Sequence, residues 1–151
     1  MDMVTSGNLS SVDESSYELG SYSLQLMWHL RQRAARAFEP LGFRTNRVLV
    51  LEYIAQGVNQ PKDLHQALGI VPPAISTIIA ELETRGLLSR QADPHDGRRV
   101  NLHLTPEGEK VRQQLSLAWQ EVRREFHDSL SKKELTTTLQ IYRKALGRPP
   151  H

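Results

Sequence analysis

Residues 87–110 read LLSRQADPHDGRRVNLHLTPEGEK, and this stretch decides how the middle of the chain is built. Residues 87–92 have the composition of a strand, and residues 93–97 form the cluster Asp-Pro-His-Asp-Gly, whose members favour turns. Over residues 99–104 polar and apolar side chains alternate, which is the period of a half-buried strand. The sequence therefore predicts a β-hairpin here.

The tip of this hairpin combines a turn signal with two cations. Asp96 and Gly97 are a favoured turn pair because both residue types tolerate positive φ angles. Arg98 and Arg99 follow directly. A protruding hairpin that carries arginine suits the narrow, electronegative minor groove of DNA.

Two predicted helices precede the hairpin. The first has Pro61 at its first position, Asp63 in its first turn and Gly69 as its stop signal. The second covers residues 72–83, opens with two prolines and ends before Gly86. Two helices joined by a short turn and followed by a hairpin indicate a winged helix-turn-helix, a DNA-binding motif.

In such a motif the second helix enters the major groove. Ala74, Ser76 and Thr77 occupy its early turns, and we expect them to contact bases or phosphates. The alternative for Ser76 and Thr77 is an ordinary exposed helix surface. Lys62 and Arg47 are candidate phosphate contacts, with a solvated charge as the equal alternative.

Long helices flank the winged region, which we place at residues 45–104. Apolar stripes run along residues 17–40 and 106–147, and the central module is too small to cover both stripes. We expect these helices to form a homodimer interface, the alternative being a helix pair within a monomer. Residues 1–16 lack periodicity and are predicted to be a mobile tail before a single domain over residues 17–147.

Helix starts are marked by capping residues. Thr45 and Thr105 are predicted N-caps, and Ser131 opens a capping box with Glu134. The predicted fold class is thus mainly α with a small β-hairpin wing.

Composition limits the other possibilities. The chain has 151 residues, a formal net charge of +2 and a sequence pI of about 9.1, so a basic surface must be local. It has no cysteine, which excludes disulfides and thiolate metal sites. There is neither a long apolar run nor a secretory signal pattern, and we expect a cytoplasmic protein that does not contact membranes.

Catalysis, metals and cofactors are not expected. The sequence has no Gly-rich phosphate loop, nucleophile elbow or paired-carboxylate arrangement. The six histidines form no i, i+4 pair and no HExxH site. Asp93, His95 and Asp96 are close together, but they lie on a predicted exposed turn that cannot exclude water.

The order and spacing of these segments resemble the MarR family of bacterial transcriptional regulators over residues 17–146. The resemblance is carried by Asp63-Leu64, Leu68-Gly69, Leu82-Glu83, Arg85-Gly86-Leu87-Leu88, the wing residues 93–98 and the segment 104–108.

The resemblance implies a homodimeric repressor of transcription that binds double-stranded DNA at a palindromic operator. In the family's Asp-x-Arg wing signature, Arg98 would enter the minor groove and Asp96 would hold its guanidinium, while Arg99 would contact a phosphate.

The resemblance also implies release by a small molecule, often an aromatic acid or a phenol, bound between the dimer helices and the winged module. Tyr22, Trp28, His29 and Arg33 are candidate binding residues, with Arg31 beside them, and the alternative is core or dimer packing.

Three positions depart from the family pattern. The family often has Ser or Asp where Val71 stands, Thr at Ala74 and Arg at Thr77. The second helix therefore has few polar side chains that are long enough to reach the bases. The alternative function is a dimeric ligand-binding or protein-interaction protein of the same fold with weakened DNA binding.

Overall fold

The hairpin and the helices lie in the order that the sequence predicts. The structure, a computed structural model, describes residues 11–147, and side chains within that range except at residues 11–13 and 125–127. It confirms the predicted fold class, mainly helical with one antiparallel hairpin. The elements are α1 (Ser11–Phe38), η1 (Glu39–Leu41), α2 (Thr45–Ala55), α3 (Pro61–Leu68), α4 (Pro72–Thr84), β1 (Leu88–Ala92), β2 (Val100–Leu104), α5 (Pro106–Asp128) and α6 (Lys132–Ala145).

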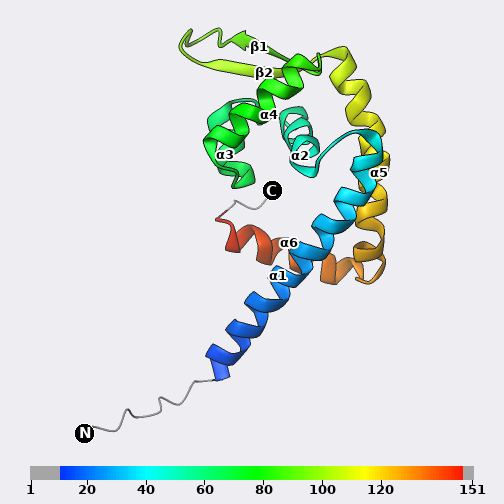
Figure 1. Cartoon of the computed structure of the whole chain (residues 1–151). Helices are drawn as coiled ribbons and strands as arrows, with labels where there is room; N and C mark the ends of the chain where they lie inside the picture. The colour runs from blue at the N-terminus through cyan, green and yellow to red at the C-terminus, as the bar shows by residue number, and fades with distance from the viewer. Residues whose placement is uncertain (1–10, 148–151) are drawn as a thin grey trace, which may run out of the picture.

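The hairpin projects from one end of the molecule beside α3 and α4, whereas α6 lies toward the opposite end (Figure 1). A single apolar core holds α2, α3, α4 and β2 together. Its fully buried side chains come from all four elements, so the hairpin is packed onto the helices rather than only tethered to them. They include Leu51, Leu64, Ile75, Ile79, Leu82 and Leu102.

The hairpin register runs from the pair Leu88 and Leu104 to the pair Ala92 and Val100. The connection is the loop over residues 93–99, and Gly97 is not among the residues with positive φ. The prediction of a turn built on positive φ angles at Asp96-Gly97 is therefore wrong. The physical reason is that the Asp93 carboxylate accepts hydrogen bonds from the backbone N–H groups of His95 and Asp96 and so shapes this longer loop.

Two helix starts differ from the sequence prediction. α1 begins at Ser11, so residues 11–16 belong to a helix instead of the predicted tail, and residues 1–10 of that tail lie outside the described part of the chain. Polar residues there carry no apolar period, yet Glu14 near the start suits the helix dipole. The N-cap of α2 is Arg44 and not Thr45.

Other helix ends agree with the prediction. Gly69 ends α3 with a φ of 65°, a left-handed conformation that glycine adopts without strain. Ser131 and Glu134 form the predicted capping box of α6. Thr105 accepts a hydrogen bond from the backbone N–H of Gly108 at 3.0 Å, as expected of an N-cap for α5.

Gly108 allows the first turn of α5 to approach the base of the hairpin. A Cβ atom at this position would lie 2.0 Å from the carbonyl oxygen of Leu87. The same segment is fixed by the Thr105 backbone N–H, which donates to that oxygen at 3.1 Å. Glycine is thus required here by contact with the backbone and not by its φ angle.

The flanking helices pack only partly within one chain. Phe38 of α1 meets Trp119 of α5 edge to face, with ring centroids 5.3 Å apart. No residue of α6 is buried. Large apolar side chains remain exposed along these helices, namely Leu19, Tyr22, Leu24, Met27, Trp28, Leu117, Leu139, Ile141, Tyr142 and Leu146.

Among residues 11–147 no single helix is both long and apolar enough to cross a membrane. Only α3 and α4 taken together reach that length, and the pair is bent by 118° at its junction.

Candidate nucleic-acid interface

A groove between the wing and the start of α3 gathers several cations. Its volume is about 660 Å³. It brings together three of the predicted DNA contacts, Lys62, Arg98 and Arg99. The full lining is Gln60, Pro61, Lys62, Asp63, Arg90, Arg98, Arg99 and Val100.

Arg90 also lines this groove, from the middle of β1. Its Nε donates to the Oε1 of Glu83 at 2.8 Å, and this hydrogen bond raises the pKa of Arg90. In the register of the hairpin, Arg90 stands opposite Leu102. The pair joins β1 to the last turn of α4, so wing and helix present one surface.

Asp93 organises the loop at the tip of the wing. Its Oδ1 accepts the backbone N–H groups of His95 at 2.8 Å and Asp96 at 3.2 Å. Its Oδ2 accepts the side-chain amide of Asn101 at 3.1 Å. The backbone N–H of His95, followed by the amide of Asn101, lowers the pKa of Asp93. The loop is therefore held in shape by a charged carboxylate.

The side-chain pair between Asp96 and Arg98 stays a prediction for the wing on DNA, and in this structure the Asp96 carboxylate pairs with Arg99. The Oδ2 of Asp96 lies 3.2 Å from Nε of Arg99, while its Oδ1 accepts the backbone N–H of Arg98 at 3.1 Å. The backbone N–H of Arg99 also donates to the carbonyl of Asp96 at 2.8 Å, which brings Arg99 back over the turn. The Arg98 residue is exposed next to this pair.

The second helix of the motif, α4, presents few polar groups. Ala74 is half-buried, and Ser76 and Thr77 are exposed, as the prediction for DNA contact requires. The Thr77 hydroxyl donates its proton to the carbonyl of Pro73 at 3.0 Å. Thr77 therefore offers its methyl group and an acceptor outward, but no donor.

Arg47 lies behind this surface. Its Nε donates to the Oε2 of Glu81 at 3.0 Å, and only 18% of its side chain is exposed. This hydrogen bond lowers the pKa of Glu81. The sequence suggested that Arg47 contacts a phosphate. In the structure, its side chain joins α2 to α4 through Glu81.

The wing is also attached to the connection between α2 and α3. The backbone N–H of Leu102 donates to the carbonyl of Asn59 at 2.8 Å. Beside this contact, the side-chain amide of Gln60 donates to that of Asn101 at 3.4 Å. The wing is thus joined to the connection before α3 by a backbone hydrogen bond.

A charged network links the winged region to α5. Arg112 donates to both carboxylate oxygens of Glu109, at 2.9 and 2.7 Å, and reaches Glu52 of α2 at 3.4 Å. The guanidinium lowers the pKa of Glu109 to about 2, and Glu109 in turn raises the pKa of Arg112. Arg112 thus joins α5 to α2 by an ion pair with Glu52.

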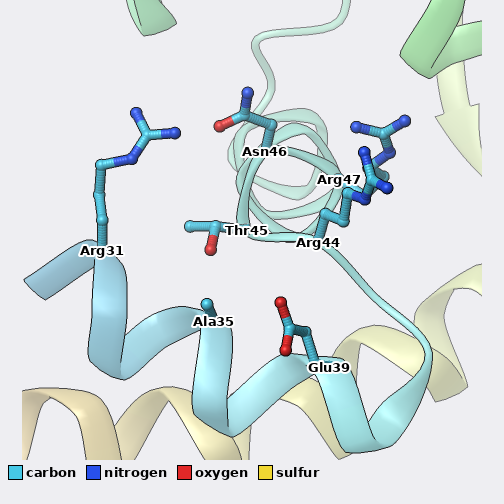
Figure 2. Close-up of a pocket in the computed structure, with 7 residues that line it drawn as sticks. All are labelled: Arg31, Ala35, Glu39, Arg44, Thr45, Asn46 and Arg47. Atoms are coloured by element: carbon cyan, nitrogen blue, oxygen red, sulfur yellow. The ribbon is translucent and has the colours of Figure 1, made fainter.

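A second pocket, of about 320 Å³, lies between α1 and the start of α2. Figure 2 shows Arg31 and Ala35 on α1, with Glu39 just beyond that helix, facing Thr45 and Asn46 of α2. Arg44 and Arg47 complete the lining.

Of the α1 residues predicted to bind an effector, Arg31 lines this pocket and the other four do not. Tyr22, Trp28 and His29 are exposed along α1, and Arg33 is half-buried on the same helix. Helical periodicity could not place the pocket because its basic groups come from two separate helices. Within residues 11–147, no three metal-ligating side chains converge.

Comparison with known proteins adds an independent line of evidence. A model of the MarR family matches residues 41–99. The transcriptional regulator HosA of Escherichia coli O111:H- is 33% identical over 88 residues, which are 54% of this chain and 65% of that protein. The chain therefore spans just under two thirds of this relative.

Solved structures show the same fold. CouR from Rhodococcus jostii RHA1 bound to p-coumaroyl-CoA has a TM-score of 0.81 at 19% identity, covering 90% of this chain and 96% of its own. The S. aureus MepR-DNA complex has a TM-score of 0.70 at 26% identity, covering 84% of this chain and 96% of its own.

Proposed function

Because this chain belongs to the MarR family of transcriptional regulators, we propose that it binds DNA in a sequence-specific manner and regulates transcription. The observation that carries the proposal is the cationic groove between the start of α3 and the wing, where Lys62, Arg98 and Arg99 meet. Cations at this place can neutralise backbone phosphates of bound DNA. The exposed Arg98 at the wing tip suits the minor groove.

Fluorescence anisotropy with DNA from upstream of the gene tests this proposal. We expect selective binding that weakens steeply with salt, and a loss of roughly tenfold or more for Arg98→Ala. Lys144→Ala, which removes an exposed cation from the last turn of α6, is the matched control and should bind as the wild type does. Weak, sequence-indifferent binding by all three proteins would refute the proposal.

The regulator acts as a homodimer on a palindromic operator, and its default effect is repression. Support comes from the exposed apolar side chains of α1, α5 and α6, whose core within one chain is incomplete. On this view residues 17–40 and 106–147 form the dimerisation region and residues 45–104 the DNA-binding module. A two-fold axis would then present two copies of α4 to successive turns of DNA.

Release by an anionic small molecule is the third part of the proposal. The pocket between α1 and α2 is lined by Arg31, Arg44 and Arg47, which suit a carboxylate. CouR, with the same fold, is a protein seen bound to p-coumaroyl-CoA. Titration calorimetry with aromatic acids should show binding that Arg31→Ala abolishes. If none of these acids releases or absorbs heat on mixing, and none changes DNA binding, this part of the proposal is contradicted.

One observation keeps a second function in view. The sequence of α4 contains no lysine or arginine. A protein-interaction module of this fold would keep its partner in the Arg98→Ala variant and would show no operator binding, so the same titration separates the two functions.

A further inference from the structure

The exposed face of α4 is chemically unusual for a helix that reads bases. The 13 residues of α4 are PPAISTIIAELET, without lysine, arginine, asparagine or glutamine. These are the side chains that form paired hydrogen bonds with guanine and adenine in the major groove. The residues exposed on and just before α4 are Val71, Pro72, Pro73, Ser76, Thr77, Ala80 and Thr84.

The charged side chains of α4 are already engaged. Glu81 accepts hydrogen bonds from Arg47 of α2, and Glu83 accepts one from Arg90 of the wing. Each carboxylate therefore has one oxygen held by an arginine of a neighbouring element. Thr77 and Thr84 donate their hydroxyl protons to backbone carbonyls of their own helix, at 3.0 and 2.9 Å. The face is left with methyl groups, proline rings and few donors.

Cations gather in one groove near this apolar face. Lys62, Arg98 and Arg99 line the groove between the start of α3 and the wing. Cations there attract DNA phosphates, while α4 offers apolar contacts. The one apolar group that an unmodified base edge shows in the major groove is the 5-methyl group of thymine.

We propose, resting on the proposed DNA-binding function, that α4 selects its half-site by contacting thymine methyl groups. Val71 is central to this contact. It is 62% exposed although it is a branched apolar residue, and it stands at the N-cap, the end that faces base edges in a helix-turn-helix. Ala80 and the Thr77 methyl extend the apolar surface along the helix. Half-sites are therefore defined by the positions of thymines.

Deoxyuridine provides the test, because replacing thymine by uracil removes only the methyl group and keeps the base pair. After footprinting defines the half-site, each thymine in it is replaced singly and binding is measured by anisotropy. Each contacted methyl should weaken binding about fourfold, since burying a group of this size is worth ~0.8 kcal/mol. The salt dependence should not change, because phosphate contacts are unaffected.

Two variants assign the effect to residues. Val71→Ser changes an exposed side chain and should fold normally; it should remove the uracil effect at one position per half-site. Arg98→Ala is the matched control, and it should weaken binding to thymine and uracil operators by the same factor. Wild-type affinity that is unchanged by uracil at every position would overturn the inference while leaving DNA binding intact. Absence of operator binding would refute the proposed function itself.

Discussion

Arg47 and Glu81 join α2 to the helix that faces DNA, with Nε of the arginine 3.0 Å from Oε2 of the glutamate. The two residues are 34 positions apart in the sequence. The arginine is mostly buried and the glutamate is 39% exposed, so water screens part of their attraction. The pair sets the orientation of α4 from behind its exposed face.

We expect Arg47→Met to lower the free energy of unfolding by about 0.5–1 kcal/mol, as for partly exposed ion pairs. DNA binding should weaken as well, because α4 loses one of its supports. Urea unfolding and anisotropy measure the two effects. Arg44→Met, at the exposed neighbouring N-cap, is the control, and equal unfolding curves for both variants would show that the pair contributes nothing.

Gly108→Ala should destabilise the fold by about 1–3 kcal/mol, in the range of overpacked sites. The new Cβ would lie 2.0 Å from the carbonyl oxygen of Leu87, so α5 must shift away from the hairpin. Gly97→Ala is matched, since nothing lies within 4 Å of its Cβ position and its φ is not positive. Thermal unfolding that does not separate the two variants would contradict this account.

The charged network at Arg112 should make stability depend on pH in the acid range. Glu109 has a pKa of about 2 in the folded protein against an ordinary value of 4.5. Its contribution to the free energy of unfolding is therefore complete when the pH is above the ordinary pKa. That contribution is lost as the pH falls toward the pKa in the folded protein. Glu109→Gln should flatten the fall of the urea midpoint between about pH 5 and about pH 3.

The matched control for this pH effect is Glu107→Gln. Glu107 lies in the same first turn of α5, is exposed, and should leave the acid dependence as it is. Because 40% of the Glu109 side chain is exposed, the effect is expected to shrink in high salt. A Glu109→Gln profile that follows the wild type would refute the assignment.

Asp93→Ala should loosen the tip of the wing without unfolding the protein. The backbone N–H groups of His95 and Asp96 lose their shared acceptor, so their hydrogen exchange should accelerate. DNA affinity should fall several-fold because Arg98 and Arg99 are less ordered. Unchanged exchange at both amides would show that the backbone alone holds the loop.

Trp28→Ser tests the proposed dimer. Trp28 is 62% exposed on α1, and a homodimer would bury it or its neighbours. In sedimentation velocity, we expect the variant dimer to dissociate at a higher protein concentration than the wild-type dimer does. Val71→Ser, an equally exposed apolar position on the DNA side, should leave the mass unchanged. Monomeric wild-type protein at all concentrations would refute the dimer.

The hairpin and its helices could be predicted because their signals are local. The strand signal over residues 99–104 and the stop at Gly69 depend on neighbours in the sequence, and the structure has a strand at Val100–Leu104 and the end of α3 at Gly69. Burial does not alternate along the strand, where only Leu102 is fully buried. The start of α1 could not be found in this way, because exposed polar residues have no apolar period. Residues 14–20 of α1 are all exposed, so no burial pattern marks this part of the helix.

The arrangement of the candidate site depends on contacts between distant residues. Asp93 reaches Asn101 across the hairpin, and this contact, not the turn dipeptide, shapes the wing loop. The pocket between α1 and α2 combines Arg31 with Arg44, which no single-helix pattern connects. Sequence periodicity therefore located the DNA-facing elements but not the partners of their charged side chains.

The hydrogen bond between Leu102 and Asn59 has a mechanical consequence. Since β2 is attached to the connection before α3, and β1 to α4 through Arg90, we expect the wing and α4 to move together. A mismatch in operator geometry then cannot be absorbed by the wing alone. Either the DNA must bend, or the wing and α4 must rotate together relative to α5. The stiffness of the DNA sequence then becomes part of what is recognised.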